Sequence, residues 1–208
     1  MSLRLLFCAG VFFIFQNLSF GQKGNLVDGY VVLISGDTLF GKIKKLSPFA
    51  LAEYVAFQKQ DNDAQIKYYP AQLSKYYFED SNYYVSDSVP FKKASEKVYF
   101  HRFFLKHLIE GTVDLYKLDY RMIENPSPLH EYQSKFYFMG STEGGILIDL
   151  TERDYLAQCY SAFKEMKCTP KLSGKTNFND EGLSSLIIAY NECLGKNSRK
   201  IYREPTKN

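Results

Sequence analysis

Histidine is the side chain most often used for metal binding and for acid–base catalysis near neutral pH, and the chain has three of them. His101 and His107 are six residues apart in a segment whose composition is typical of a β-strand. An extended strand would separate them by about 20 Å, whereas one zinc ion holds its ligand nitrogens at about 2.1 Å. His130 lies in a proline-bearing loop, a position that suits a functional residue, but no local pattern supports a role for it. The histidines therefore predict no metal site, and the sequence has no motif for another cofactor.

The other residue types used in catalysis do not form a known motif either. The glycine cluster of residues 140–145 lacks the Gly-Lys-Ser/Thr ending of a phosphate-binding loop, and we expect a hairpin turn there. Asp149 and Glu152 are candidate carboxylates, but hydrolytic pairs usually come from distant parts of a fold. Cys159 lies on the apolar stripe of a predicted helix, which favours a buried thiol over a nucleophile. The sequence thus favours a protein without catalytic activity.

Aromatic residues are the unusual part of the composition. Phenylalanine and tyrosine together supply 34 residues, and tryptophan is absent. Tyrosine doublets occur at three places, and in a strand each doublet directs one ring to each face of the sheet. Tyrosine suits half-buried sheet positions in general, and this explanation is favoured. The alternative is that the outward rings form an aromatic binding surface for a peptide or a glycan, although the lack of tryptophan argues against a sugar. The residues of this candidate surface are Tyr68, Tyr69, Tyr76, Tyr77, Tyr83 and Tyr84.

The elements that would carry these residues change in type along the chain. Residues 29–150 are β-rich, with short runs of Val, Ile, Tyr and Phe separated by turn residues. Residues 29–35 and 38–43, for example, flank Gly36-Asp37, which predicts a two-residue hairpin turn. Strands joined by short turns form antiparallel sheet. We therefore expect an antiparallel β-meander or a partly closed barrel or roll.

Residues 151–195 are expected to be helical. Thr151 and Asn179 are candidate starts of two C-terminal helices, and Gly195 is a candidate stop. Apolar residues recur at helical spacing after each start. Strands followed by helices predict an α+β fold, with a single domain over residues 22–195.

The N-terminal residues 1–21 have the form of a cleavable signal peptide. Arg4 precedes an apolar run over residues 5–15, and the small residues Ser19 and Gly21 precede a cleavage site at Gln22. The alternative is a retained membrane anchor, which needs about 20 apolar residues and is interrupted here too early. We expect an exported protein, in the periplasm, at the cell surface or secreted, with no transmembrane segment after cleavage.

The charge balance argues against one class of partner. The chain has 26 basic and 23 acidic residues, and loss of Arg4 with the signal peptide lowers the formal net charge from +3 to +2. A nucleic-acid interface usually needs a clustered basic face, so no nucleic acid is expected as partner. The one basic cluster is the tail of residues 196–208, for which a flexible, solvated terminus is favoured over a partner-binding arm.

Three cysteines remain after cleavage, namely Cys159, Cys168 and Cys193. They allow at most one internal disulfide. The long connection after Cys168 can fold back toward Cys193, which favours a Cys168–Cys193 bridge and leaves Cys159 as a free, buried thiol. In a tight helical hairpin, however, neither Cys159 nor Cys168 would be ideally placed against Cys193.

Three stretches of the chain carry a resemblance to a known group of proteins. The first reads Gly29-Tyr-Val-Val-x-x-x-Gly36-Asp37-Thr38-x-x-Gly41-x-Ile43, and the second Phe104-Leu-Lys-His-Leu-Ile-Glu-Gly111-x-Val-x-Leu-Tyr116. The third comprises Phe163 to Cys168 and Tyr190-Asn191-Glu192-Cys193. In these stretches the chain resembles a family of uncharacterised exported proteins that is common in Bacteroidota. The resemblance implies export and a C-terminal cysteine pair, here Cys168 and Cys193, and it implies no activity.

Together these patterns give a functional hypothesis. We expect a noncatalytic binding or interaction module of the cell envelope, whose partner is an envelope protein, a peptide or a glycan. The alternative is a hydrolase that acts on an envelope polymer or glycan, built from carboxylates or His130 brought together by the fold.

Overall fold

A computed structural model of the chain describes residues 26–61, 63–79, 82–92, 98–123, 131–141, 147–165, 168, 176–195 and 199–200. The predicted signal peptide, His130, most of the glycine cluster and most of the basic tail lie outside these residues.

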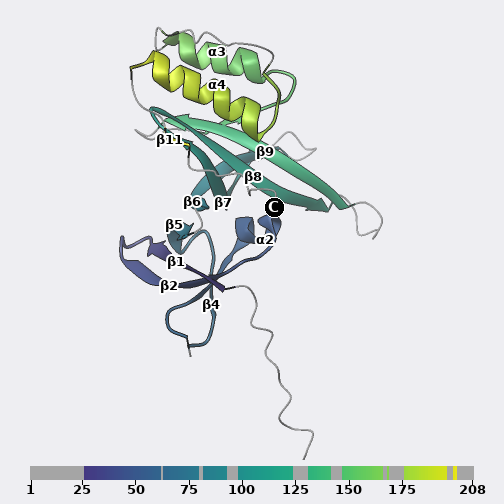
Figure 1. Cartoon of the computed structure of the whole chain (residues 1–208). Helices are drawn as coiled ribbons and strands as arrows, with labels where there is room; N and C mark the ends of the chain where they lie inside the picture. Colours follow the sequence, from purple (N-terminus) through teal and green to yellow (C-terminus); the bar gives the residue numbers. More distant parts are fainter. Residues whose placement is uncertain are drawn as a thin grey trace, which may run out of the picture.

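One antiparallel sheet organises the protein (Figure 1). Its strands in chain order are β1 (Leu26–Leu33), β2 (Thr38–Lys44), β3 (Val55–Gln58), β4 (Ile66–Tyr68), β5 (Leu73–Phe78), β6 (Tyr83–Lys92), β7 (Val98–Glu110), β8 (Val113–Ile123), β9 (Glu131–Ser141) and β10 (Ile148–Leu150). Their spatial order is β10-β9-β8-β7-β6-β5-β1-β2-β3-β4. The predicted α+β class and the antiparallel meander are confirmed, and the sheet is open rather than closed into a barrel. In this order, β1 and β5 are the one pair of neighbours that do not follow each other in the sequence.

The first hairpin has a different turn from the one predicted. Gly36 donates its N–H to the carbonyl of Leu33 at 3.0 Å, so the turn spans residues 33–36 and not Gly36-Asp37. Gly36 has a φ of 95°, the left-handed conformation that follows the turn in a three-residue hairpin loop. The prediction was wrong because a glycine with positive φ fits both a two-residue and a three-residue hairpin loop, so the glycine alone does not fix the position of the turn.

Two further glycines allow β5 and β3 to pack closely against the β1–β2 hairpin. Gly29 and Gly41 lie directly opposite each other on β1 and β2. A Cβ atom at Gly29 would overlap the carbonyl oxygen of Tyr77, and one at Gly41 would overlap that of Gln58. A larger residue at either position would push β5 or β3 away from the hairpin, so both positions require glycine.

Sequence analysis did not predict helix α2 (Pro48–Glu53). Its signals are nonetheless present, because Ser47 caps the helix by accepting a hydrogen bond from the N–H of Ala50, and Pro48 occupies the first turn. The helix contacts β7 and β8. It also joins two parts of the core, since Leu51 packs in one apolar cluster and Ala52 in another.

The two C-terminal helices are α3 (Tyr155–Glu165) and α4 (Asp180–Cys193). Asn179 caps α4 through a 2.8 Å hydrogen bond from the N–H of Gly182, and Gly195 follows the helix with a φ of 70°. Figure 1 shows both helices over the β8–β9 end of the sheet, opposite the end that carries β1, β2 and β4. Their apolar faces form one core cluster with β7, β8, β9 and β10, which includes Leu115, Met139, Leu186 and Tyr190.

Cys168 and Cys193 form the predicted disulfide, with Cα atoms 6.1 Å apart. Cys159 is free and buried, and burial raises the pKa of its thiol to about 12. A disulfide is compatible with an exported protein. No helix in the described part of the chain has the length and apolar character needed to cross a membrane.

One short element falls within the predicted flexible tail. Arg199 and Lys200 form β11, which pairs with Glu110 and Ile109 of β7. This pairing is available because β6 pairs with β7 only up to Lys106. The free edge beyond that point accepts a short strand from the end of the chain.

Candidate functional site

Six rings form a line across one face of the sheet, and we call this line the aromatic row. In spatial order its members are Phe40, Tyr30, Tyr77, Tyr83, His107 and Tyr116, one from each of β2, β1, β5, β6, β7 and β8. The distances between successive ring centroids are 5.8, 5.3, 6.4, 5.4 and 4.6 Å. These distances are within the range of direct aromatic contact.

The strand register places these rings in line. Tyr30 pairs with Phe40 on one side and with Tyr77 on the other, and Tyr77 pairs with Tyr83. Directly opposite residues on one face have Cβ atoms about 4.5–5.5 Å apart, and aromatic side chains at this spacing come into van der Waals contact. The row runs from Phe40, which is 71 % exposed, to the buried His107 and the half-buried Tyr116.

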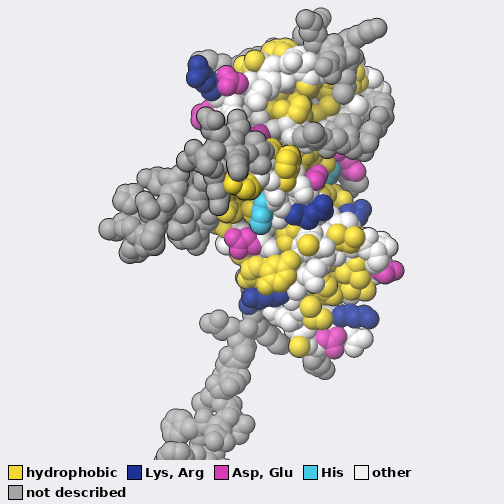
Figure 2. Space-filling view, turned by 180° about the vertical axis from the view of Figure 1, so that it is seen from behind, with side chains coloured by type: hydrophobic (Ala, Val, Ile, Leu, Met, Phe, Trp, Pro, Cys, Tyr) yellow, Lys and Arg dark blue, Asp and Glu magenta, His cyan; other side chains and the backbone are white. Residues whose placement is uncertain are grey.

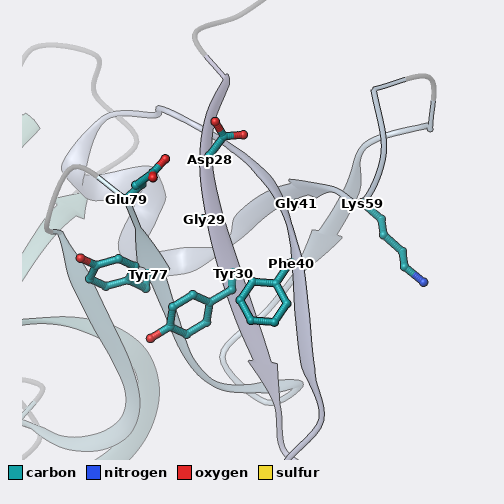
Figure 3. Close-up of a pocket in the computed structure, with 8 residues that line it drawn as sticks. All are labelled: Asp28, Gly29, Tyr30, Phe40, Gly41, Lys59, Tyr77 and Glu79. Carbon is teal, nitrogen blue, oxygen red and sulfur yellow. The ribbon is translucent and has the colours of Figure 1, made fainter.

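A pocket of about 520 Å³ lies at the exposed end of the row (Figure 3). We call it the hairpin pocket, because it is built on the β1–β2 hairpin and the neighbouring end of β5. It is open to solvent and is lined by Asp28, Gly29, Tyr30, Phe40, Gly41, Lys59, Tyr77 and Glu79. Seen from behind the view of Figure 1, the surface has hydrophobic patches with lysines and carboxylates among them (Figure 2).

The charges of the hairpin pocket are unevenly placed. Asp28 and Glu79 lie beside one another on neighbouring chain segments, because the N–H of Glu79 donates to the carbonyl of Asp28 at 2.9 Å. Lys59 extends away from the three rings (Figure 3). Lys42 lies opposite Asp28 in the register, but its ammonium is 2.5 Å from Asp61 and the hydrogen bond to Asp61 raises its pKa. One end of the pocket is therefore acidic.

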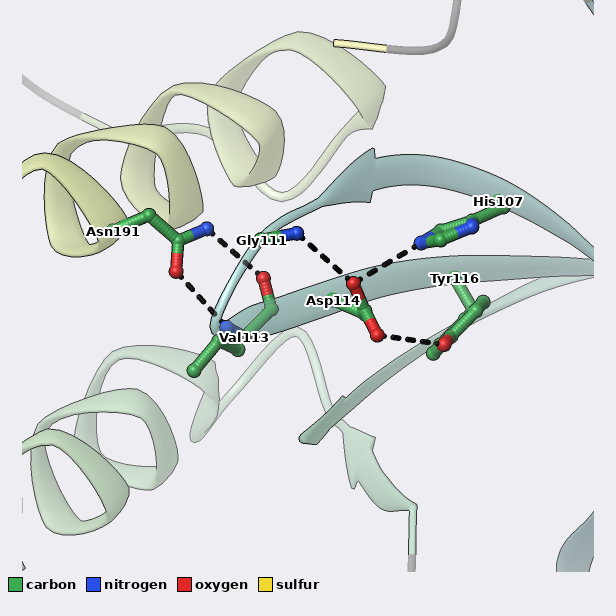
Figure 4. A network of polar contacts seen from close by, with 6 residues as sticks. All are labelled: His107, Gly111, Val113, Asp114, Tyr116 and Asn191. Carbon is green, nitrogen blue, oxygen red and sulfur yellow. Dashed lines mark hydrogen bonds and ion pairs between the residues drawn. The ribbon is translucent and has the colours of Figure 1, made fainter. Parts of the chain in front are cut away.

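The buried end of the row leads to a polar cluster under the β7–β8 hairpin (Figure 4). The carboxylate of Asp114 accepts hydrogen bonds from the N–H of Gly111 at 3.1 Å and from the hydroxyl of Tyr116 at 3.0 Å. Nε2 of His107 lies 3.3 Å from the same carboxylate, at ion-pair distance but without hydrogen-bond geometry. Burial and the neighbouring carboxylate raise the pKa of Tyr116. Since His107 and Asp114 are buried, this cluster supports the hairpin and does not offer reactive groups to a ligand.

Helix α4 is fixed to the same hairpin by Asn191. Its side chain accepts a hydrogen bond from the N–H of Val113 at 2.9 Å and donates one to the carbonyl of Val113 at 3.0 Å. A Cβ atom at position 111 would overlap the Asn191 amide, so Gly111 makes this contact possible. The hairpin that holds His107 and Tyr116 is thus anchored to the C-terminal helix.

A second polar contact fixes the start of α4. Asp180 accepts hydrogen bonds from Tyr137 at 2.5 Å and from Lys117 at 3.0 Å. Burial acts to raise the pKa of Asp180, but these two hydrogen bonds and the Lys117 charge outweigh it and lower the pKa. The negative charge also suits the first turn of a helix.

The six tyrosines of the predicted aromatic surface lie in different places. Tyr77 and Tyr83 belong to the aromatic row, whereas Tyr76 and Tyr84 are buried on the opposite face and stack at 4.6 Å. Two of the doublets therefore divide between the faces as expected. Tyr68 packs against the core and the exposed Tyr69 contacts Tyr54, so neither reaches the row.

The other residues considered for chemistry are not brought together. His101 is exposed and its ring contacts that of Phe103 at a tilted angle, while His107 is buried in the row. Asp149 is half-buried on β10, and burial raises its pKa, but Glu152 is exposed before α3. Within the described residues, no group of three or more His, Cys, Asp or Glu side chains is arranged to hold a metal ion.

Sequence analysis missed Tyr30, Phe40, Asp28 and Glu79. The alternation along β1 and β2 puts Tyr30 and Phe40 on one face, which is a signal the sequence contains, but the contact with Tyr77 depends on the long-range pairing of β1 with β5.

Comparisons of the chain with protein-family models, with curated proteins and with solved structures give no match.

Proposed function

We propose that this protein is an exported, noncatalytic binding module of the cell envelope, and that it holds a peptide or glycan in the hairpin pocket. The observation that carries the proposal is the pocket itself, where three rings of the aromatic row meet two carboxylates and a lysine. Ligand sites commonly have volumes of about 300–1,000 Å³ and combine apolar walls with a few polar groups. The pocket of about 520 Å³ has this composition.

The exposure of the rings supports binding over a purely structural role. Phe40 is 71 % exposed at the mouth of the pocket, although burial of such a side chain would be worth about 1.5–3 kcal/mol. Tyr30 and Tyr77 are half-buried and stack at 5.3 Å with an interplanar angle of 24°. A ligand that covers these rings would gain apolar contact that the protein does not supply itself.

Export is supported by the signal-peptide pattern of residues 1–21, by the resemblance of the three sequence stretches and by the disulfide. We expect the protein recovered from its native envelope to have an intact mass that begins at Gln22. Alkylation in denaturant without reduction should modify one cysteine, the buried Cys159, and alkylation in denaturant after reduction should modify three. An uncleaved chain with four reactive thiols would contradict export.

The pocket is tested by Tyr77→Ser in the mature protein. We expect about 30-fold weaker binding to cell-wall and membrane fractions of the source cells, because truncation of an aromatic anchor removes about 2 kcal/mol of binding free energy. Co-sedimentation over a range of protein concentrations measures this loss.

Tyr160→Ser is the matched control, since Tyr160 is 41 % exposed on α3, a helix that contributes no residue to the pocket. Its binding should equal that of the unchanged protein. Equal binding by both variants and the unchanged protein would rule out the pocket as the binding site.

One observation favours a second candidate, a hydrolase acting on an envelope polymer. Asp28 and Glu79 both line the hairpin pocket, and glycoside hydrolases use two carboxylates on either side of the scissile bond. Both carboxylates are exposed, however, whereas a general acid is usually held in an apolar environment that keeps it protonated. Release of soluble fragments during the co-sedimentation experiment would distinguish hydrolysis from binding.

A further inference from the structure

We infer that the ligand of the hairpin pocket is a peptide with a basic side chain, whose cationic group lies between Asp28 and Glu79 and whose stem lies on the rings of Tyr30 and Tyr77. This inference rests on the proposed function and specifies the chemistry of its ligand. It is drawn from three properties of the pocket: its charge, the faces of its rings and its openness to solvent.

The charge of the pocket favours a cation. The acidic end holds two exposed carboxylates, and the ion pairs among the described residues include neither of them. The nearest lysine in the register, Lys42, is paired with Asp61 at 2.5 Å. Lys59, the cation among the lining residues, is directed away from the rings (Figure 3). Asp28 also acts on Lys42 by charge, but Lys42 makes its ion pair with Asp61, so an ammonium or guanidinium group of a ligand would add counter-charge to both pocket carboxylates.

The rings favour the same ligand. An aromatic face attracts a cation by about 0.5–2 kcal/mol, depending on how far the pair is desolvated. The sheet already contains this contact, because the ammonium of Lys67 lies 4.6 Å from the centre of the Tyr54 ring. Lysine and arginine also have aliphatic stems that cover apolar surface while the charged group stays in a polar environment. Tyr30 and Tyr77 offer such a surface directly beside the two carboxylates.

The openness of the pocket admits a peptide. Because the pocket is open to solvent, a peptide backbone can pass over it while one side chain enters. A neutral glycan would contact the rings but would make no charge–charge interaction with Asp28 and Glu79.

The test is an NMR titration of the ¹⁵N-labelled mature protein with capped pentapeptides. Their central residue is lysine, N-acetyl-lysine or glutamate between small neutral residues, and a neutral chitin-type oligosaccharide is the fourth probe. We expect the lysine peptide to shift the amide signals of β1, β2 and the end of β5. We expect about tenfold weaker binding after acetylation, and a marked loss at high salt because exposed charges are screened.

The double variant Asp28→Asn, Glu79→Gln should weaken binding of the lysine peptide by about tenfold or more, whereas Glu152→Gln should leave it unchanged. Equal binding of the lysine and N-acetyl-lysine peptides would overturn the inference. Shifts at the pocket with the oligosaccharide alone would overturn it too, but would leave the proposed function in place. If none of the probes shifts the pocket signals, the inference is contradicted, and the co-sedimentation of Tyr77→Ser with envelope fractions decides the proposed function separately.

Discussion

Asn191→Ala should lower the free energy of unfolding by about 2–4 kcal/mol, as measured by urea denaturation of the mature protein. The substitution removes two hydrogen bonds, to the N–H and to the carbonyl of Val113. Asn191 is fully buried and Val113 nearly so, so the two backbone groups would be left without partners in the core. A buried donor or acceptor that loses its partner destabilises a protein by about 1–3 kcal/mol.

The control for this prediction is Ser185→Ala on the same helix. Ser185 is exposed, and a surface substitution of this kind changes stability by less than about 0.5 kcal/mol. If Asn191→Ala and Ser185→Ala unfold at the same urea concentration as the unchanged protein, the side chain of Asn191 does not anchor α4 to the β7–β8 hairpin.

The second large effect is expected from loss of the disulfide. Replacement of both Cys168 and Cys193 by serine should lower the free energy of unfolding by about 3 kcal/mol, because the bridge closes a loop with a sequence separation of 25 residues. The bridge joins the segment after α3 to the last turn of α4, so its loss increases the freedom of the whole C-terminal region in the unfolded state.

The unchanged protein under reducing conditions provides an independent measurement. It should show the same loss of stability as the double serine variant, and reductant should have no further effect on that variant. A stability of the unchanged protein that does not depend on reductant would contradict a structural role for the bridge. Cys159 is retained in both samples, so its buried thiol cannot cause a difference between them.

Local sequence patterns were sufficient to predict much of the fold. The turn Glu110-Gly111-Thr112 separates two runs of strand-forming residues, and β7 and β8 end and begin next to it. Asn179 and Gly195 were expected at the two ends of a helix, and they flank α4. These features could be predicted because a turn or a helix end is decided by a few adjacent residues.

The features that were not predicted depend on contacts between distant parts of the chain. The pairing of β1 with β5 brings Tyr30 against Tyr77 across an intervening helix and three strands, and no local pattern indicates that pairing. The tyrosine doublets showed which residue types would lie on a sheet face, but not which rings would be neighbours. Helix α2 was not predicted because its six residues are too few to show a helical repeat of apolar positions.

The most direct test of a ligand site at the hairpin pocket is an NMR map of the protein with its native material. The ¹⁵N-labelled mature protein would be titrated with soluble fragments from an enzymatic digest of the source cells' own envelope. We predict shifts concentrated at residues 28–30, 40–41 and 77–79, with none along α3, and their loss in Tyr77→Ser. Shifts confined to α3 and α4, or shifts that persist unchanged in Tyr77→Ser, would contradict a binding site on the aromatic row.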